Sequence, residues 1–524
     1  MARYDYVVIG AGSAGCVLAS RLAESRDLSV LLLEAGGPDN RREIPVPIAF
    51  STMFKTEVDW NYTTEPQPNL HGRALYWPRG KVIGGSSSIN AMIYIRGNSR
   101  DFDEWERLDN PGWAYRDVLP YFLRAEDQQR GASEFHGVGG PLRVEDLRTV
   151  NPLSRAFVAA AIESGLRGNE DFNGREQDGA GFYQVTQKRG HRWSAADAYL
   201  RPRRSYPNLT ILPHAHVTQI LLAKYRATGV EYVRDGRESA VYADREVLLC
   251  AGAVNSPQLL MLSGIGPAKH LEELGIEVHL DLPGVGENLQ DHLFLPVSYE
   301  CPKPVSLIAA SSFSSLLGYM LFRRGMLTSN VAESGGFVRT RPDADRPNLQ
   351  FLFGAAFYLN HGLVRPKDHG FSIGPTLLRP ESRGRIRLRG TFPMDQPRIE
   401  PDYLSRDSEV EVMVAGIELA RRIAAANPLR TYCGKEVVPG ADIKSRGEIA
   451  GYVRDAAETT YHPVGTCKMG TDAMAVVDAR LAVRGIQGLR VVDASIMPTI
   501  TSGNTNAPVI MIAEKAADLI LQAK

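Results

Sequence analysis

The sequence predicts an α/β protein of at least two domains, with a nucleotide-binding unit at its N-terminus. Three observations lead to this prediction. The chain has 524 residues, which is more than one hydrophobic core usually holds together. Hydrophobic residues make up 44% and charged residues 23% of the sequence, as is typical of a globular protein. Residues 4–34 have the pattern strand, glycine turn, helix and strand, which is the order of a nucleotide-binding unit.

The elements of this N-terminal unit follow one another closely. Residues 4–9 form an apolar run of strand length that stops at a glycine turn, residues 10–15, with the pattern GxGxxG. Residues 14–23 are predicted as a helix with its apolar side chains on one face, and residues 28–33 as a second buried strand. A GxGxxG pattern alone is weak evidence, but one placed between two strands indicates a Rossmann-like unit.

Each glycine of the turn has its own predicted role. Gly10 permits the tight turn, Gly12 lets the backbone approach a pyrophosphate, and Gly15 lets the helix pack closely against the strand. The N-terminus of the helix supplies a favourable field for phosphate. Glu34 ends the second strand, where a carboxylate can accept hydrogen bonds from both ribose hydroxyls of an adenosine. The unit therefore predicts an adenine dinucleotide, without separating FAD from NAD.

Composition and charge exclude several classes of protein. The 60 basic residues balance the 60 acidic ones, so no general attraction to nucleic acid is expected. The five cysteines include no CxxC pair, which predicts neither a disulfide framework nor a metal site. The first residues run directly into the predicted strand and leave no room for a signal peptide. We therefore expect a cytoplasmic protein.

One uncharged segment, Val305 to Phe322, is the best candidate for a membrane contact. It includes five serines and one glycine, so a transmembrane span is not expected. We expect a buried helix here. The alternatives are an apolar lid, or a peripheral surface at the inner membrane face that touches lipid while Arg323 and Arg324 reach the headgroups.

Several later segments are so rich in glycine and small polar residues that they indicate loops near a ligand rather than helices or strands. They are residues 79–90, 252–257, 263–267 and 282–292. None of them repeats the pattern GxGxxG. Near the C-terminus, a Tyr-His-Pro turn at 461–463 and a Gly-Asn-Thr-Asn segment at 503–506 precede a closing helix.

With these motifs the chain resembles the glucose-methanol-choline (GMC) flavin oxidoreductases along essentially its whole length. The regions at 80–96 and 252–267 match the two signatures of that family, together with the N-terminal turn and the C-terminal His/Asn segment. A finer resemblance, to bacterial FAD-dependent alkanol dehydrogenases, rests on residues 77–81, 182–188 and 329–337. The resemblance implies that the dinucleotide is FAD.

The resemblance also implies two discontinuous domains. Residues 1–150, 205–300 and 460–524 would form the Rossmann-like FAD-binding domain, because motifs for one cofactor are spread over them. Residues 151–204 and 301–459 would form a substrate-binding domain of the α+β type, built on an antiparallel sheet, that covers the flavin.

Positions around the cofactor follow from the same resemblance. The N-terminal turn and Glu34 would hold the adenosine diphosphate half, Asp493 would lie by the pyrophosphate, and Asn506 would lie close to the flavin ring. Some family members tether FAD through a histidine; Ile89 stands at the matching position, so FAD is expected to be non-covalent. The predicted cofactor contacts are Gly10, Gly12, Ser13, Ala14, Gly15, Glu34, Val82, Gly85, Asn90, Ala91, Met92, Ile93, Val217, Asp493, Ala494 and Asn506.

Alcohol oxidation needs a base, because a carbon gives up hydride readily only as the O–H proton leaves. His462 is the candidate base, since a neutral imidazole can accept that proton. Asn504 would donate a hydrogen bond to the same oxygen, and flavin N5 would receive the hydride. Most histidines are structural or exposed, and Asn504 and Asn506 could instead be turn or helix-capping residues.

Glu333 leaves two alternatives open. In choline-oxidising relatives a carboxylate in the matching stretch helps to hold a quaternary ammonium group, so choline has to be considered as a substrate. A cation site also needs an aromatic cage, and only Phe337 is nearby in the sequence. The other alternative is a carboxylate satisfied by backbone or arginine at the cavity wall.

The predicted function is the oxidation of a primary alcohol, expected to be aliphatic, with electrons passed to a quinone or similar acceptor. An oxidase that uses O₂ directly and a choline dehydrogenase are the first alternatives. Light-driven decarboxylation of fatty acids is disfavoured by the His462/Asn504 pair. A non-catalytic FAD-binding protein is the alternative from a different class.

Overall fold

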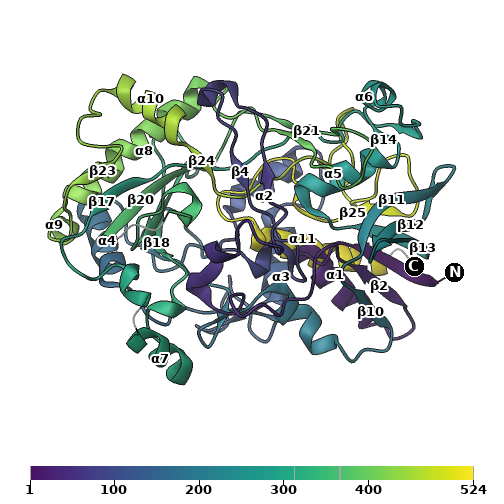
Figure 1. Cartoon of the computed structure of the whole chain (residues 1–524), viewed down its shortest axis with the longest axis horizontal. Helices are drawn as coiled ribbons and strands as arrows, with labels where there is room; N and C mark the ends of the chain where they lie inside the picture. Colours follow the sequence, from purple (N-terminus) through teal and green to yellow (C-terminus); the bar gives the residue numbers. More distant parts are fainter. Residues whose placement is uncertain (1, 312, 365–367, 523–524) are drawn as a thin grey trace.

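Two large sheets lie at opposite ends of the molecule, the first on the right and the second on the left of Figure 1. The computed structural model describes residues 2–311, 313–364 and 368–522. Both ends of the chain lie beside the first sheet. One hydrophobic core extends through both halves, from the strands of the first sheet to those of the second.

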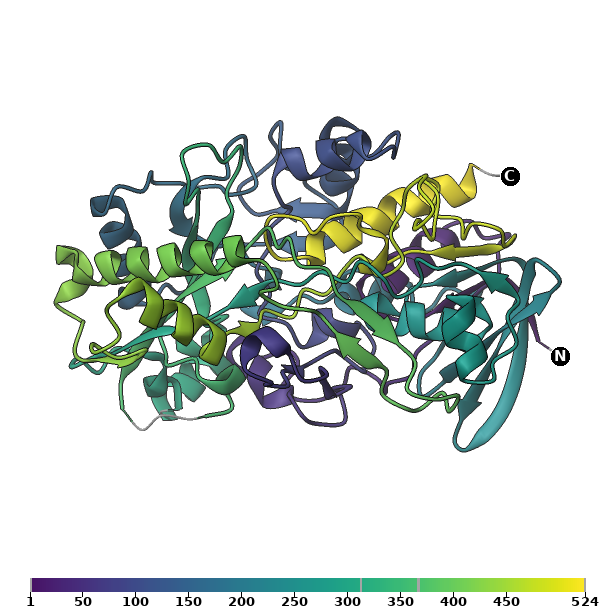
Figure 2. The same ribbon diagram turned by 90° about the horizontal axis from the view of Figure 1, so that it is seen from above.

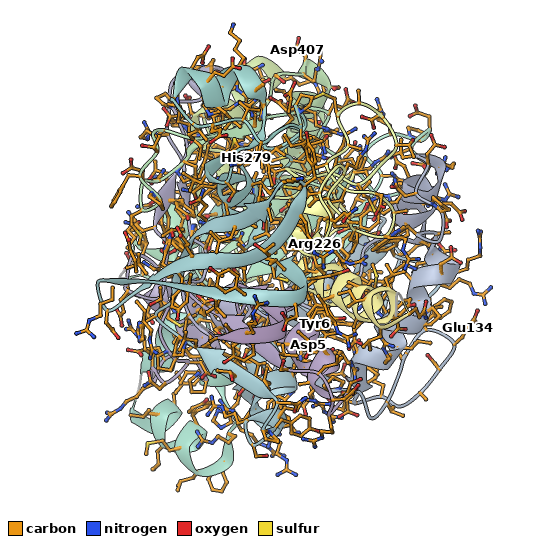
Figure 3. The ribbon with its side chains drawn as sticks, turned by 90° about the vertical axis from the view of Figure 1, so that its right-hand side faces the viewer. Asp5, Tyr6, Glu134, Arg226, His279 and Asp407 are labelled. Atoms are coloured by element: carbon orange, nitrogen blue, oxygen red, sulfur yellow. The ribbon has the colours of Figure 1, made fainter. Side chains whose placement is uncertain are left out.

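The first sheet has seven strands and is mixed. Its strands run in the order β10 (Leu209–Leu212), β2 (Val30–Leu33), β1 (Arg3–Ile9), β13 (Arg237–Leu249), β12 (Arg226–Arg234) and β11 (His216–Ala223), and β25 (Leu489–Val491) pairs with β13. The pairs among β10, β2, β1, β13 and β25 are parallel, whereas β11, β12 and β13 form an antiparallel meander. Figure 3 faces this end of the molecule, with Asp5 and Tyr6 of β1 and Arg226 of β12 labelled.

The N-terminal unit has the predicted order of elements. β1 leads through the glycine turn into α1 (Ser13–Ala23), and β2 returns parallel to β1, with Tyr6 opposite Val30. α1 packs against the closing helix α11 (Asn506–Leu521), which in turn packs against α3 (Tyr115–Ala125). The N-terminal unit and the closing helix of the chain thereby lie side by side (Figures 1 and 2).

The second sheet has eight strands, and every pair in it is antiparallel. Its strands are β23 (Glu436–Val438), β17 (Val297–Glu300), β20 (Gly370–Leu377), β19 (Leu349–Gly354), β18 (Ala332–Val338) and β7 (Gly179–Phe182), in that order. In addition, β16 (Leu293–Phe294) pairs with β20, and β24 (Glu458–Thr459) pairs with β16. α4 (Pro152–Glu163) and α8 (Asp407–Ala425) contact each other and the sheet. The predicted fold class, α/β with a second antiparallel sheet, is confirmed.

Side chains of β19 show how the second sheet forms one wall of a cavity. Phe351 and Phe353 are fully buried, and Phe353 stacks on Phe157 of α4. Leu352 and Gly354, the alternate positions, line the cavity described below. Because successive side chains of a strand point to opposite faces, one face of β19 packs in the core and the other lines the cavity.

The bounds of the two domains stay a prediction, but strand pairing bears on one of them. β16 and β17, within residues 293–300, pair with the second sheet. The predicted boundary at residue 300 assigns them to the FAD-binding domain instead. Their sequence gives no sign of this, because pairing partners such as Ser372 and Ile373 lie far along the chain.

The remaining helices and paired strands are short and connect these layers. They are α2 (Ser99–Arg107), α5 (Gly252–Leu262), α6 (Ala268–Glu273), α9 (Asn427–Arg430), α10 (Arg446–Ala456), and the pairs β3 (Tyr62–Thr63) with β4 (Tyr76–Trp77), β5 (Glu126–Gln128) with β6 (Leu142–Val144), β8 (Gln187–Lys188) with β9 (His191–Arg192), β14 (Ile265–Gly266) with β15 (Leu280–Asp281), and β21 (Arg385–Arg387) with β22 (Arg398–Glu400).

Within the uncharged segment that ends at Phe322, the structure has the helix α7 (Phe313–Phe322). The prediction that this segment forms a buried helix is wrong, because α7 projects from the lower edge of the molecule in Figures 1 and 3 and exposes several large apolar side chains. The absence of charge in a segment does not predict whether another element packs over the helix that it forms. No helix in the described part of the chain is both long and apolar enough to cross a membrane.

Candidate functional site

A cavity extends from the N-terminal glycine turn to the inner face of the second sheet, and its walls come from segments far apart in the sequence. Most of the predicted site residues line it: Gly10, Gly12, Ser13, Ala14, Glu34, Gly85, Asn90, Ala91, Met92, Ile93, Val217, His462, Asp493, Ala494, Asn504 and Asn506. Three do not: Gly15, Val82 and Glu333. The tertiary structure thus brings the separate motifs to one site.

The glycines of the first turn allow backbone segments to meet. A Cβ atom on Gly10, whose φ is +94°, would lie 2.7 Å from the carbonyl oxygen of Cys250. A Cβ on Gly15 would lie 1.8 Å from the carbonyl oxygen of Gly10. Gly12, in contrast, has no atom within 4 Å of its Cβ position. Gly15 therefore serves the packing of α1 against the turn, and Gly12 presents open backbone to the cavity.

Glu34 lies at the end of β2 with both carboxylate oxygens engaged by backbone. The Ala11 N–H donates to Oε2 and the Gly36 N–H to Oε1, each at 2.8 Å. Burial raises the pKa of this carboxyl to about 7, against the effect of the two hydrogen bonds. Each carboxylate oxygen can accept a further hydrogen bond, and the side chain lines the cavity.

The loop after residue 79 packs directly on the first turn. A Cβ on Gly85, whose φ is +54°, would lie 2.6 Å from the Cα of Gly12. Asn90, further along, has its side-chain oxygen bonded to the Met92 N–H and to the guanidinium of the buried Arg192. Val82 is the exception in this loop, because it is fully buried and forms a backbone bridge with Gly37 outside the cavity.

Two C-terminal residues of the predicted set are fixed beside the turn. The carboxylate of Asp493 accepts hydrogen bonds from the Gly252 N–H, the Ser256 hydroxyl and the Ser495 N–H. The side-chain oxygen of Asn506 accepts from the Ser13 hydroxyl at 2.7 Å. Since α1 begins at Ser13 and α11 at Asn506, the N-termini of two helices meet at the cavity, where they favour an anion.

His462 and Asn504 also meet at the cavity. The amide Nδ2 of Asn504 lies 3.2 Å from Nε2 of His462. The Asn504 Oδ1 lies 3.4 Å from Nε2 of Gln350, which donates to it, so the NH₂ group faces the histidine. The two residues are 42 positions apart in the chain, and the structure brings them together as predicted.

His292 determines which nitrogen of His462 carries the proton. Nε2 of His292 lies 3.0 Å from the carbonyl oxygen of Leu378, which can only accept, so this nitrogen bears the hydrogen. Nδ1 of His292 is then an acceptor, and it faces Nδ1 of His462 at 3.0 Å. His462 therefore donates from Nδ1 and keeps the lone pair on Nε2, the nitrogen beside Asn504.

Burial lowers the pKa of both histidines and so favours their neutral forms. Burial lowers the pKa of His292 to about 3. The pKa of His462 lies well below its ordinary value, chiefly because of burial and further because of His292 and Arg79. A neutral His462 whose Nε2 carries no hydrogen can accept a proton at neutral pH.

The backbone before His462 is held in an unusual conformation. Tyr461 has a φ of +69°, which is rare for a bulky residue. Its N–H donates to the Thr459 hydroxyl at 2.7 Å, and its carbonyl accepts from the Arg79 guanidinium at 2.6 Å. The His462 N–H donates to Asp291 at 2.8 Å. Surrounding groups therefore fix the turn that presents His462 to the cavity.

Three residues of the site, His292, Asp291 and Arg79, have no role predicted from the sequence. His292 and Asp291 close the glycine-rich segment 282–292, and Arg79 opens the segment 79–90, so all three belong to segments that indicate loops near a ligand. Nothing in one sequence indicates that they contact the turn at 461–463. Only the tertiary structure shows it.

The far end of the cavity, near His462, has apolar and aromatic walls. Phe50, Phe54, Phe294, Val331, Leu352 and Tyr358 line it. Phe54 packs edge-on against Tyr461, and Phe294 edge-on against Tyr358. The acidic residues that line the cavity, among those the structure describes, are Glu34 and Asp493, and both lie at the glycine-turn end.

Glu333 lies outside this cavity. Its carboxylate accepts hydrogen bonds from the Asn151 N–H at 2.7 Å, the Ser154 hydroxyl at 2.8 Å and the Ser329 hydroxyl at 2.6 Å. The side chain is buried on β18, and burial raises its pKa. The structure does not bring Glu333 to His462. The carboxylate is buried and satisfied, as in the second alternative, but by one backbone N–H and two serine hydroxyls rather than by arginine, and away from the cavity wall.

Comparison with known proteins finds that the chain is similar to members of one family. Two models described as GMC oxidoreductase match residues 4–294 and 380–513. The chain is 47% identical to an alcohol dehydrogenase [acceptor] of Pseudomonas putida, over 99% of this chain and 96% of that protein. It is 45% identical to the mitochondrial choline dehydrogenase of Mus musculus, over 99% and 89% respectively. The crystal structure of pyridoxine 4-oxidase from Mesorbium loti superposes with a TM-score of 0.91, at 36% identity and 98% coverage of both chains. FAD is typical of proteins in this family.

Proposed function

Because the chain belongs to the GMC oxidoreductase family, we propose that it oxidises primary alcohols, aliphatic ones in particular, to aldehydes with non-covalently bound FAD. Electrons would then pass to a quinone or a similar acceptor. The observation that carries this proposal is the unprotonated Nε2 of His462, which faces the Asn504 amide at the apolar end of the cavity.

The walls of the cavity suit FAD. Gly12 leaves its backbone open, and α1 and α11 both begin at the same place, which favours a pyrophosphate. Glu34 lies at the end of β2 with lone pairs to spare for ribose hydroxyls. Ile89 lines the cavity at the position where a tethering histidine would stand, which supports non-covalent binding.

When bound, FAD would supply the two-electron oxidant that takes hydride from the alcohol carbon. The protein's own residues handle the proton and the orientation. His462 would accept the hydroxyl proton on Nε2, and the Asn504 amide would donate a hydrogen bond to the same oxygen and fix its direction. His292 would hold the imidazole in the required tautomer throughout.

The walls near His462 indicate the class of alcohol. Phe50, Phe54 and Leu352 offer apolar contact, and no described carboxylate lines that end to balance a cation. An uncharged alcohol with an apolar chain therefore suits this end of the cavity.

Choline is the second candidate, because aromatic rings can also stabilise a quaternary ammonium group. Phe54, Tyr358 and Tyr461 lie close together at the cavity wall, and aromatic faces attract such cations. The identity to choline dehydrogenase from Mus musculus adds to this candidate.

The test is the rate at which different alcohols bleach the flavin in the absence of oxygen. We expect straight-chain primary alcohols to reduce the holoenzyme fastest. Choline should reduce it at least about tenfold more slowly, because no described carboxylate at that end of the cavity balances its positive charge. Faster reduction by choline would replace the aliphatic assignment.

The acceptor is tested separately by following peroxide in air and the reduction of a quinone without oxygen. We expect turnover with the quinone and little peroxide. One peroxide formed for each alcohol consumed would make the protein an oxidase instead.

A further inference from the structure

The helix α7 carries an apolar surface that no other element of the described chain covers. Of its described side chains, Leu316 and Leu317 are 47% and 46% exposed, and Met320, Leu321 and Phe322 are 63%, 63% and 66% exposed. Large apolar side chains gathered in this way on one protruding helix mark a contact surface. We propose that α7 is the surface by which this protein docks on a membrane that contains anionic lipids.

The helix is attached to the body of the protein. Tyr319, on its inner side, is only 4% exposed, and its hydroxyl lies 3.4 Å from the carbonyl oxygen of Pro45. Immediately after the helix, the Gly325 N–H donates to the Thr149 hydroxyl at 3.0 Å. The exposed apolar side chains are therefore presented on a fixed platform.

Positive charges border the apolar side chains. Arg323 and Arg324 follow α7 directly, and the exposed Arg148 reaches the carbonyl of Phe322. Arg148 and Arg324 line a surface hollow together with Leu321 and Phe322. Among the described residues none of the three arginines forms a salt bridge, and the nearby Asp146 is paired with Arg130.

This arrangement matches the chemistry of a lipid surface. Apolar side chains at the boundary of headgroups and acyl chains, with arginines level with the headgroups, are typical of helices that lie on membranes. Each arginine near an anionic leaflet adds attraction. The apolar side chains of α7 match the boundary of the acyl chains, and the arginines at its end, which form no salt bridge with a described residue, match the anionic headgroups.

A second copy of the chain fits the same surface less well. In a two-fold dimer the same patch meets itself, so the arginines that border one α7 would approach those of the other. Like charges at such a contact oppose association. A membrane with anionic lipids satisfies both the apolar and the charged part of the surface.

The helix also lies near one wall of the cavity. Tyr319 contacts Pro45, and the segment that follows, the 3₁₀ helix Pro47–Met53, contains Phe50 of the cavity wall. The 3₁₀ helix Met326–Thr328, just after α7, packs on that same segment. Docking through α7 would thus bring this wall of the cavity near the lipid, where apolar molecules concentrate.

The test is sedimentation of the holoenzyme with vesicles. Vesicles of phosphatidylcholine alone are compared with vesicles that also contain phosphatidylglycerol, at low and at high salt. We expect binding to the anionic vesicles, weakened by salt because the charges are screened. Failure to bind anionic vesicles at low salt would overturn the proposal.

Variants separate the two parts of the surface. The triple variant Met320→Ser, Leu321→Ser and Phe322→Ser should lose at least about tenfold in vesicle affinity. Arg324→Gln with Arg148→Gln should lose about fivefold for each charge. Matched controls are Val138→Ser with Tyr225→Ser and Met474→Ser, and Arg234→Gln with Arg237→Gln, all of them exposed positions elsewhere and expected to bind as the unaltered protein does.

Two more measurements distinguish membrane docking from misfolding and from self-association. The α7 variants should keep dye-linked alcohol oxidation in solution, which shows that they fold. If the triple variant instead changes the mass of the protein in solution and leaves vesicle binding intact, α7 is a contact between copies of the chain, and the membrane proposal is wrong.

Discussion

The two ends of the cavity are built in different ways. At the glycine-turn end, the walls are mostly backbone: Gly10, Gly12 and Gly85 bring chain segments together, and Glu34 is held by two N–H groups. At the other end, side chains make the site, with His462 positioned by His292 and Asn504. At the first end the glycine turn itself is local in sequence and distant segments pack on it, whereas at the second end the reactive group itself depends on residues far apart in the chain.

This contrast indicates where each kind of change should act. Damage to the backbone-built end should remove the cofactor and destabilise the fold together, because the same atoms do both. Damage to the side-chain end should remove chemistry while cofactor binding persists. The following predictions test that separation, in decreasing order of effect.

The strongest loss is expected for His462→Ala. Loss of the base should slow flavin reduction by alcohol by about 10²- to 10⁴-fold, whereas the protein should still bind FAD, because His462 lies at the opposite end from Glu34. Rapid-mixing measurement of flavin bleaching checks the rate, and absorbance checks the FAD content. His71→Ala, an exposed histidine paired with Asp455, is the control and should change neither. Unchanged bleaching would remove His462 from the proposed role.

Gly15→Ala should instead reduce stability and FAD binding. A Cβ atom 1.8 Å from the Gly10 carbonyl oxygen forces the turn and α1 apart, which should cost about 3 kcal/mol of stability and reduce FAD content. Thermal unfolding and flavin content measure both. Gly451→Ala, in α10 with open space around its Cβ position, is the matched control and should be neutral or slightly stabilising. A stable, fully loaded Gly15→Ala protein would contradict the packing role.

His292→Leu should have a smaller effect than either. Without its acceptor, His462 is free to place its proton on either nitrogen, so the rate of reduction should fall about tenfold or more. The pH profile adds a readout that a structural role alone would not move. The low pKa of His462 means that activity is present at neutral pH and is lost only as pH falls well below 6.5. Removal of His292 removes one cause of that low pKa, so the acid limb should move to higher pH.

His292→Asn is the conservative companion, because an amide oxygen can still accept from Nδ1 of His462. It should restore part of the lost rate. An acid limb in His292→Leu at the same pH as in the unaltered protein would show that His292 does not act through His462.

Glu333→Gln should change the chemistry least. Because this side chain does not line the cavity, the ratio of kcat/KM for choline and for a straight-chain alcohol should change by no more than about twofold. Stability should fall instead, since three hydrogen-bond donors lose a charged acceptor. A selective loss of choline activity would place Glu333 in substrate recognition after all.

The N-terminal unit could be predicted in detail because its information is local. Strand, turn, helix and strand follow one another within residues 3–33, and a glycine with positive φ or a close backbone contact leaves its mark in the sequence itself. The position of Glu34 at the end of β2 follows from the same local order. The motifs at 461–463 and 503–506 were likewise recognisable, and the family resemblance identified His462 and Asn504 as partners.

The amino-acid order, together with the family resemblance it carries, was thus enough for the fold class, for the glycine turn and for a set of site residues most of which line the cavity. It was not enough to place β16 and β17 in the second sheet, to expose α7, to turn Glu333 away from the cavity or to fix the tautomer of His462 through His292. Those features depend on burial, strand pairing and hydrogen-bond partners, which arise from contacts between distant segments. The local sequence pattern predicts the conformation of the backbone, but it does not predict which distant segment a side chain will contact.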